Sequence, residues 1–468
     1  MSLYLFLGVA SAIFLAEAAL LYHRGRSIAF PLGLVLMYHL TLVGAWLLVA
    51  ENRGFDPVNA GLGYTYLYER LFPVRLDDDY RLALQLYATF LVTIGGVLLL
   101  RVRPLTAARA NAPPPLPLSH GRLLTVCGAA AAGTFLFFRE SIQLALSSGA
   151  SAYVISRAGE NNPAFAIGAI LSRAALMPAA LGLATLCSGP GARYIVARTT
   201  RPWHLLGYVV VIGGMFALAA TLGSKNELLT SMITGVLFYL ANSPRPRYGI
   251  LIGLGSVAAV SIGAIELLRA SPLALIGSAV NRDTAFLVLT APFTSNEIFA
   301  AHFSMYGALH EHLPLTWGAS LENFALSVVP RLFWPDRPPD VYAYYASGVG
   351  ATEGQGYTIH HATGWYLNFG LPGVVIGAVV LAWIWSSLHN AIAADLPRRL
   401  VGRVFTVIAP WTFVAGIPGL IRSGPEGYKG LIINSLLVPT CILVVACAVF
   451  RARPVLAPTP SPVLTGAD

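Results

Sequence analysis

The sequence predicts an all-α, polytopic transmembrane helical bundle of about eleven helices with one large extracytoplasmic loop. Three observations carry this prediction. Of the 468 residues, 56% are hydrophobic and only 11% are charged, whereas soluble globular domains carry about 25% charged residues. Apolar runs long enough to cross a bilayer recur along the chain. The long segment from Arg269 to Trp365 contains no such run, so it is expected to lie outside the bilayer.

Apolar runs of about 17 to 25 residues identify the transmembrane helices. The predicted spans are 3–22, 28–50, 83–100, 123–138, 164–187, 205–222, 228–241, 250–268, 366–387, 404–420 and 431–450. The chain is accordingly divided into eight helices in 1–268, a periplasmic loop at 269–365, three helices in 366–450 and a cytoplasmic tail at 451–468. The tail is rich in proline and is expected to be disordered.

The distribution of cations predicts the orientation. With the N-terminus outside, the inner segments hold 16 of the 30 Lys and Arg residues, with Asp395 and Asp468 as their only acids. The outer segments are about twice as long, carry the other 14 cations and hold nearly all the acids. The long loop is therefore expected outside the cytoplasm, and the C-terminus in the cytoplasm.

The net charge of +9 does not indicate a nucleic-acid partner, because the arginines occur in small groups between apolar runs and form no continuous basic face. The expected partner is the lipid bilayer. The four cysteines all lie inside apolar runs, which predicts buried thiols and neither a disulfide framework nor a metal site. No cofactor is indicated.

An acidic triplet, Asp77, Asp78 and Asp79, precedes an apolar-periodic helix in the first outer loop. Acids at a helix start are explained by capping and by the helix dipole. The alternative is a metal site built from a carboxylate cluster, as in polyprenyl-phosphate-sugar transferases that use an acidic motif in this loop. Capping is the interpretation we favour.

Several outer cations are candidates for binding a diphosphate. Arg157 lies in the second outer loop, and Lys225 lies in a tight turn between two spans, where it could also snorkel or pair with Glu227. Arg173 lies inside an apolar run, where charge is costly and function is a fair expectation. The alternative for Arg173 is an ion pair with Glu17 or Glu266.

The long loop supplies the remaining candidates. The stretch SVVPRLFWPDRPPD contains Arg331 and Arg337, and Arg282 lies earlier in the same loop. His360 and His361 precede the next apolar run, and imidazole can accept a proton near neutral pH. We therefore expect one of this pair, with His361 preferred, to act as a catalytic base. His302, His310 and His312 lack ligand-like spacing and are expected to be loop histidines.

Three motifs resemble those of a known family. These are GSKNELL at 223–229, VPRLFWPDRPP at 329–339 and GWYLNFGLPGVVIG at 364–377. Together with the many-helix layout and the late outer loop, they are similar to the Wzy-type O-antigen or oligosaccharide repeat unit polymerases. Arg337 stands where relatives commonly carry a lysine before proline.

The resemblance implies a membrane glycosyltransferase of the broad GT-C type in lipopolysaccharide biosynthesis. Its substrates would be undecaprenyl-diphosphate-linked oligosaccharides, one as donor and one as acceptor, and a chain-length-regulating membrane protein is a further possible partner. The diphosphate is a good leaving group, so arginines could stabilise its departure without a metal.

Other functions stay open at this point. An O-antigen ligase shares the donor and the large loop, but there a loop histidine is followed by Asn, Ser or Gln, whereas His361 is followed by Ala362. Another lipid-sugar transferase is a second alternative. A lipid-linked-oligosaccharide transporter is a third, and it would need cations lining a central cavity.

Overall fold

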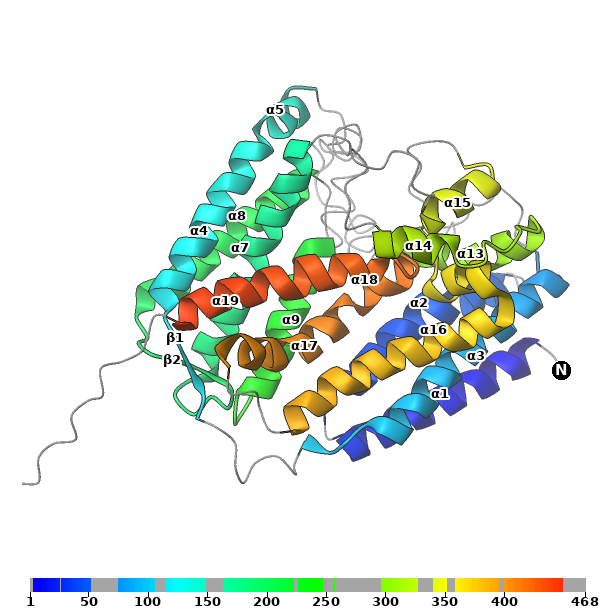
Figure 1. Ribbon diagram of the computed structural model, residues 1–468, viewed down its shortest axis with the longest axis horizontal. Helices are drawn as coiled ribbons and strands as arrows, with labels where there is room; N and C mark the ends of the chain where they lie inside the picture. Colours follow the sequence, from blue (N-terminus) through cyan, green and yellow to red (C-terminus); the bar gives the residue numbers. More distant parts are fainter. Residues whose placement is uncertain are drawn as a thin grey trace, which may run out of the picture.

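The computed structural model describes residues 3–25, 27–51, 75–105, 114–148, 163–222, 226–247, 296–326, 340–351, 358–394 and 399–448. These residues form a bundle of long helices, drawn in Figure 1. The helices of the first half are α1 (Leu3–Gly25), α2 (Ala29–Glu51), α3 (Asp78–Arg101), α4 (His120–Phe137), α5 (Arg139–Ser148), α7 (Pro163–Ser188), α8 (Pro202–Leu222) and α9 (Asn226–Asn242). The second half contributes α13 (Asn296–His310), α14 (Ala319–Leu326), α15 (Val341–Gly348), α16 (His361–Ala393), α17 (Leu400–Arg422), α18 (Gly427–Gly430), the π-helix η2 (Leu431–Leu437) and α19 (Val438–Ala448).

Within the described residues, eight helices are long and apolar enough to cross a membrane. They are α1, α2, α3, α7, α8, α16, α17 and the continuous run from α18 through α19. Each coincides with one of the eleven predicted spans, which confirms the prediction of an all-α polytopic membrane protein. The predicted spans at 123–138 and 228–241 form α4 and α9, which are helical but outside these eight, and the span at 250–268 lies almost wholly outside the described residues.

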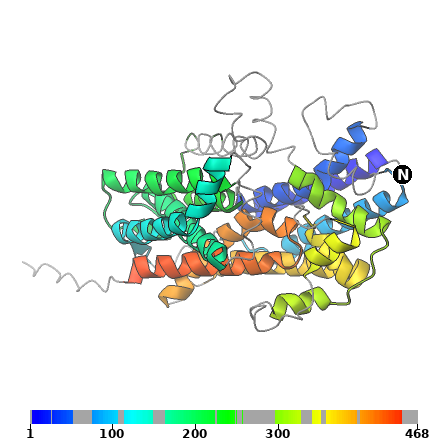
Figure 2. The ribbon, with the colours of Figure 1, turned by 90° about the horizontal axis from the view of Figure 1, so that it is seen from above.

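The long helices fall into two groups with α17 between them. One group contains α4, α7, α8 and α9, and the other contains α1, α2, α3 and α16 (Figures 1 and 2). Helix α17 packs against α9 of the first group and against α2 and α16 of the second. In the membrane-spanning part of α17, 83% of the residues are buried, whereas the value for α1 is 28%. Helix α17 is therefore central in the bundle, and α1 is peripheral. A helix that is apolar on every side belongs in such a central position.

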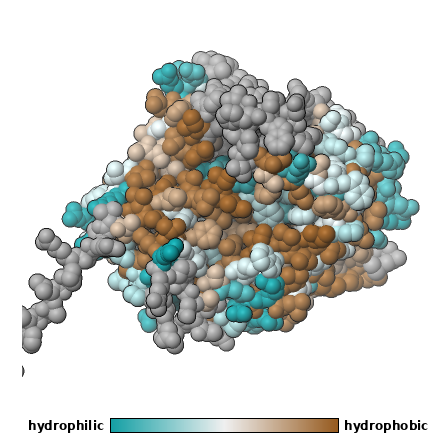
Figure 3. Space-filling model, in the orientation of Figure 1, coloured by the Kyte–Doolittle hydropathy of each residue, from teal (hydrophilic) through white to brown (hydrophobic). Residues whose placement is uncertain are grey.

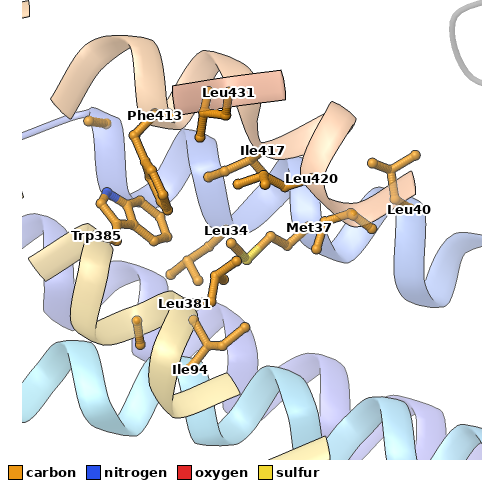
Figure 4. Close-up of a cluster of buried hydrophobic side chains, with 14 of the residues drawn as sticks. Leu34, Met37, Leu40, Ile94, Leu381, Trp385, Phe413, Ile417, Leu420 and Leu431 are labelled. Carbon is orange, nitrogen blue, oxygen red and sulfur yellow. The ribbon is translucent and has the colours of Figure 1, made fainter. Parts of the chain in front are cut away.

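Large apolar side chains of α2, α3, α16, α17 and η2 pack together in the core beside α17 (Figure 4). Leu34 and Met37 of α2 meet Trp385 of α16 and Ile417 of α17 there, and all four are almost fully buried. On the face drawn in Figure 3, apolar residues run across the middle of the molecule, and hydrophilic residues lie mostly toward its margins. Such an apolar band is the surface that a lipid bilayer covers.

The described parts of the predicted loop at 269–365 contain α13, α14, α15 and the start of α16. Figure 1 shows these helices together at one end of the bundle. None of the eight candidate spans begins between 269 and 360 in the described residues. In its described parts the segment thus forms helices joined by turns, and it lies at one end of the bundle.

A two-stranded parallel sheet lies at the opposite end of the bundle, formed by β1 (Leu116–Leu118) and β2 (Ile195–Ala197). Strand β1 lies in the linker between α3 and α4. The side chain of Asn242 holds the sheet to α9, because its Oδ1 accepts from the backbone N–H of Ile195 at 3.1 Å and its Nδ2 donates to the carbonyl of Ile195 at 2.9 Å.

Candidate functional site

The predicted histidine pair lies where α16 begins, at the end of the bundle that is expected to be extracytoplasmic. Helix α16 starts at His361, five residues before the predicted span, because His360 caps it. The Nδ1 atom of His360 accepts a hydrogen bond from the backbone N–H of Ala362 at 3.0 Å. An N–H group can only donate, so the proton of this neutral ring resides on Nε2. That Nε2–H donates to the hydroxyl of Thr41 in α2 at 2.9 Å.

His361 also has a partner at each ring nitrogen. Its Nδ1 lies 3.0 Å from the carbonyl oxygen of Gly424, in the turn after α17. A carbonyl can only accept, so this nitrogen carries the proton. The other nitrogen, Nε2, accepts from the indole N–H of Trp365 at 3.1 Å.

A third histidine, His302 of α13, belongs to the same buried group. Its Nδ1 donates to the backbone carbonyl of Thr41 at 2.7 Å, and its Nε2 accepts from the hydroxyl of Tyr80 at 2.8 Å. We call His302, His360 and His361, with the hydroxyl groups of Thr41 and Tyr80, the histidine network. It joins α2, α3, α13, α16 and the turn after α17.

The histidine network is closed to solvent. The exposed fraction is 1% for His302 and 0% for both His360 and His361. Burial lowers the pKa of His302 to about 4, and burial together with the neighbouring imidazoles lowers the pKa of His360 well below its usual value. All three rings are therefore neutral. For His361 to take a proton from a substrate hydroxyl, Trp365 would first have to release Nε2, so the role of His361 as a base stays a prediction that depends on this rearrangement.

Helix α16 is broken two turns after the histidine pair. Phe369 and Gly370 leave the helical conformation, and Gly370 has φ 66° and ψ −148°, a region that is essentially restricted to glycine. Pro372 follows and lacks a backbone N–H, so the break leaves carbonyl groups without helical partners. Thr316 is the partner of one of these carbonyl groups, because its backbone N–H donates to the carbonyl of Leu367 at 2.7 Å.

The side chain of Asn368 connects the first part of α16 to the segment from Thr316 to Ser320 by hydrogen bonds. Its Oδ1 accepts from the hydroxyl of Thr316 at 3.1 Å, and its Nδ2 lies 2.7 Å from both Ser320 Oγ and the carbonyl oxygen of Gly364. The side chain is fully buried. The first two turns of α16 and the start of α14 are thus one hydrogen-bonded unit.

The turn after α17 attaches α15 to the bundle. Gly424 has φ 62°, and its N–H donates to the carbonyl of Ile359. The carboxylate of Glu426 accepts from the backbone N–H of Val341 at 2.9 Å, while Asp340 caps the same helix by accepting from the N–H of Ala343 at 2.7 Å. Burial is the main cause that raises the pKa of Glu426 to about 7.

The predicted cations are mostly outside the part of the chain that the structure describes. These are Arg157, Lys225, Arg282, Arg331 and Arg337. Arg173 is described, lies in α7 and is partly buried. The described residues show no ion pair between Arg173 and Glu17, since Glu17 lies against Gly95 of α3. The grouping of the cations around one diphosphate stays a prediction.

The acidic triplet begins α3, as the capping interpretation predicts. The side chain of Asp77 accepts from the backbone N–H of Tyr80 at 2.9 Å, and its other oxygen accepts from the hydroxyl of Tyr306 at 3.0 Å. Asp77, Asp79 and His310 also bring three potential metal-ligand atoms within 4.8 Å of one another. Because both oxygens of Asp77 are already engaged, its position is explained without a metal ion.

The sequence alone did not reveal the partners of the histidine pair. His302 was expected in a loop, but it lies in α13, where the run NEIFAAHFSMYGALH is mostly apolar and could have indicated a buried helix. Thr41 and Tyr80 carried no signal, because they are ordinary hydroxyl residues of their helices, which also contain Tyr38 and Tyr87. Asn368 lies in the motif GWYLNFGLPGVVIG, but its partners Thr316 and Ser320 are about fifty residues away in the chain.

Comparison of the chain with models of protein families, with curated proteins and with solved structures finds no match.

Proposed function

We propose that this protein is a membrane glycosyltransferase that polymerises undecaprenyl-diphosphate-linked oligosaccharide repeat units into a surface polysaccharide. The growing glycan leaves its lipid diphosphate and is transferred to a hydroxyl of a second lipid-linked unit at the periplasmic face. The observation that carries the proposal is the junction at the start of α16. There, the motif GWYLNFGLPGVVIG forms a capped, broken helix that is hydrogen-bonded to the loop segment from Thr316 to Ser320.

This junction suits a transferase that works at a membrane surface. A break in a transmembrane helix is tolerated where the freed backbone groups find partners in the protein, and such breaks are common beside substrate sites. The helices α13, α14 and α15 lie over the same end of the bundle (Figure 1), so substrates held there would be bounded by the loop and by the spans. Positioning of this kind contributes much of the rate in group transfer between two bound substrates.

The chemistry we propose needs no metal ion. Direct attack by the acceptor hydroxyl on the anomeric carbon inverts that centre and releases the diphosphate. Arg157, Arg173, Lys225, Arg282, Arg331 and Arg337 are proposed to stabilise the leaving diphosphate. His361, or else His360, is proposed to remove the hydroxyl proton once Trp365 or Thr41 has released the ring.

Reconstitution tests the proposal. Lipid-linked repeat units extracted from cells that lack the protein are incubated with the purified protein in lipid vesicles, with and without excess chelator. A ladder of longer glycans in both samples supports the proposal. Unchanged single repeat units would overturn it, and a ladder formed only without chelator would move the leaving-group chemistry to the ligand atoms of Asp77, Asp79 and His310.

A transporter of lipid-linked oligosaccharides is the second candidate, because transporters also place broken helices at their binding sites. The break of α16 at Gly370 is therefore an observation in favour of a transporter. Deletion of the protein in cells distinguishes a polymerase from a transporter. Loss of a polymerase leaves single lipid-linked units at the periplasmic face, whereas loss of a transporter leaves them at the cytoplasmic face.

A further inference from the structure

The structure contains a carboxyl group, Glu17, inside a membrane-spanning helix and away from the histidine network. Glu17 lies in α1, on the stripe of residues that the helix buries against its neighbours. That stripe is Leu7, Ala10, Phe14, Glu17, Ala18, Leu21 and Gly25. The spacing of three and four residues is that of an apolar packing face, so Glu17 occupies a position where an apolar side chain is expected.

Glu17 lies well away from both ends of α1. A rise of about 1.5 Å per residue places Glu17 ~12 Å from Gly25 and ~21 Å from Leu3. The ends of α1 and α3 lie at the same level, because Nε of Arg24 donates to the carbonyl of Val102 at 3.0 Å. The carboxyl is therefore well inside the apolar part of both helices.

Gly95 of α3 makes room for this carboxyl. A Cβ atom at Gly95 would overlap both Cδ and Oε2 of Glu17, whereas a Cβ at the next residue, Gly96, would meet nothing within 4 Å. Only 9% of Glu17 is exposed. The absence of a side chain at Gly95 thus creates a notch in α3, and the Glu17 carboxyl fills it.

The Oε2 atom of Glu17 is buried and has no hydrogen-bond partner among the described residues. Among the described helices, α2 and α3 make the main packing contacts with α1. Their described titratable side chains include His39 and Tyr38 of α2 and, in α3, Asp78, Asp79, Tyr80, Arg81, Tyr87 and Arg101. The described residues show no hydrogen bond or ion pair between any of these groups and Glu17. The closest cation along α3, Arg101, donates instead to Ser386 of α16 at 3.1 Å.

An ionised carboxylate in hydrocarbon with no partner is strongly unfavourable, whereas a neutral carboxylic acid is tolerated. We propose that Glu17 is a proton-binding site inside the membrane, a carboxylic acid that stays protonated in the seam between α1 and α3. Its ligand is a proton, and it loses this proton only when the seam admits water. This site is independent of the proposed glycosyl transfer.

Infrared spectroscopy of the purified protein in an ester-free detergent tests the proposal directly. A protonated carboxylic acid has a C=O stretching band that is separate from the carboxylate bands. At about pH 7.5, roughly three units above the ordinary pKa of glutamate, we expect this band in the wild type and its loss in Glu17→Gln. The matched control is Glu140→Gln, because Glu140 lies in α5 with 82% of its side chain exposed.

A difference spectrum in which Glu17→Gln removes a carboxylate band in place of the acid band would overturn the proposal. A second measurement uses the wild-type protein alone and so does not depend on the folding of a variant. A hydrophobic carbodiimide reacts with protonated carboxyl groups inside membranes, and peptide mass spectrometry locates the adduct. An adduct on Glu17 at the same pH is expected, and its absence would equally overturn the proposal.

Discussion

The indole of Trp365 donates a hydrogen bond to Nε2 of His361 from one turn further along α16, at 3.1 Å. This bond occupies the nitrogen that a catalytic base would use, since Nδ1 of His361 is bound to the carbonyl of Gly424. The pair therefore has two possible roles, stabilisation of the helix junction and proton transfer, and different substitutions separate them.

Replacing His361 by Ala should destabilise the protein by about 1–3 kcal/mol, because it leaves the Trp365 N–H and the Gly424 carbonyl unpaired in a buried site. His23→Ala is the matched control, since His23 is exposed at the end of α1. Thermal unfolding in detergent measures both variants.

Measurements of activity test the second role, proton transfer by His361. Trp365→Phe removes the donor and frees Nε2, so polymerisation should persist in Trp365→Phe and fall about 10²- to 10⁴-fold in His361→Ala. Full activity in a variant that lacks both His360 and His361 would remove the base from the proposed mechanism.

The break in α16 should depend on Gly370. Alanine at this position has to adopt φ 66° and ψ −148°, which costs about 1–3 kcal/mol. Gly96→Ala is the control, because a Cβ there meets no atom within 4 Å. We expect Gly370→Ala to lower the unfolding temperature and to expose α14 to protease, and Gly96→Ala to do neither. Equal behaviour of the two variants would contradict the break.

Stability should fall as the pH rises toward neutrality, because of Glu426. Its pKa in the folded protein is raised to about 7, so between the ordinary value and 7 the folded state binds a proton that the unfolded state has released. The stabilisation is complete below about pH 4.3 and is lost as the pH rises through 7. Unfolding measured from acidic to neutral pH should show this slope in the wild type and in Glu311→Gln, and a smaller slope in Glu426→Gln.

Arg337 is expected to contribute to binding of the donor diphosphate. Loss of one charge-assisted contact to a diphosphate costs about 1.5–3 kcal/mol, or roughly 10- to 100-fold in donor binding. Arg337→Ala should remove most polymerisation while the protein stays in the membrane, and Arg337→Lys should retain part of it. Arg81→Ala is the control, since Arg81 is exposed and pairs with the exposed Asp78. Normal glycan chain length in Arg337→Ala cells would contradict the assignment.

The orientation can be tested by cysteine labelling in intact cells. Ser347 is exposed in α15, and Ser461 lies in the predicted cytoplasmic tail outside the described residues. A membrane-impermeant thiol reagent should label Ser347→Cys directly and Ser461→Cys only after the inner face is opened. The reverse pattern would place the long loop in the cytoplasm and would remove the basis for the proposed site.

The sequence by itself predicted the eight long apolar helices found in the described residues. Hydropathy and length are local properties, and a run such as 83–100 has to satisfy its own backbone within a helix once it enters lipid. The cap at Asp77 is equally local, because a carboxylate reaches an N–H only three residues away. These features were therefore predictable from neighbouring residues.

Only the tertiary structure decided what the polar groups inside the bundle contact. His360 is 319 residues from Thr41, and His302 is 222 residues from Tyr80, so no local pattern could pair them. The notch at Gly95 that receives Glu17 depends in the same way on the register of α1 against α3. A buried polar group must find a partner or lose its charge, and which of the two occurs is set by the helices that packing brings beside it.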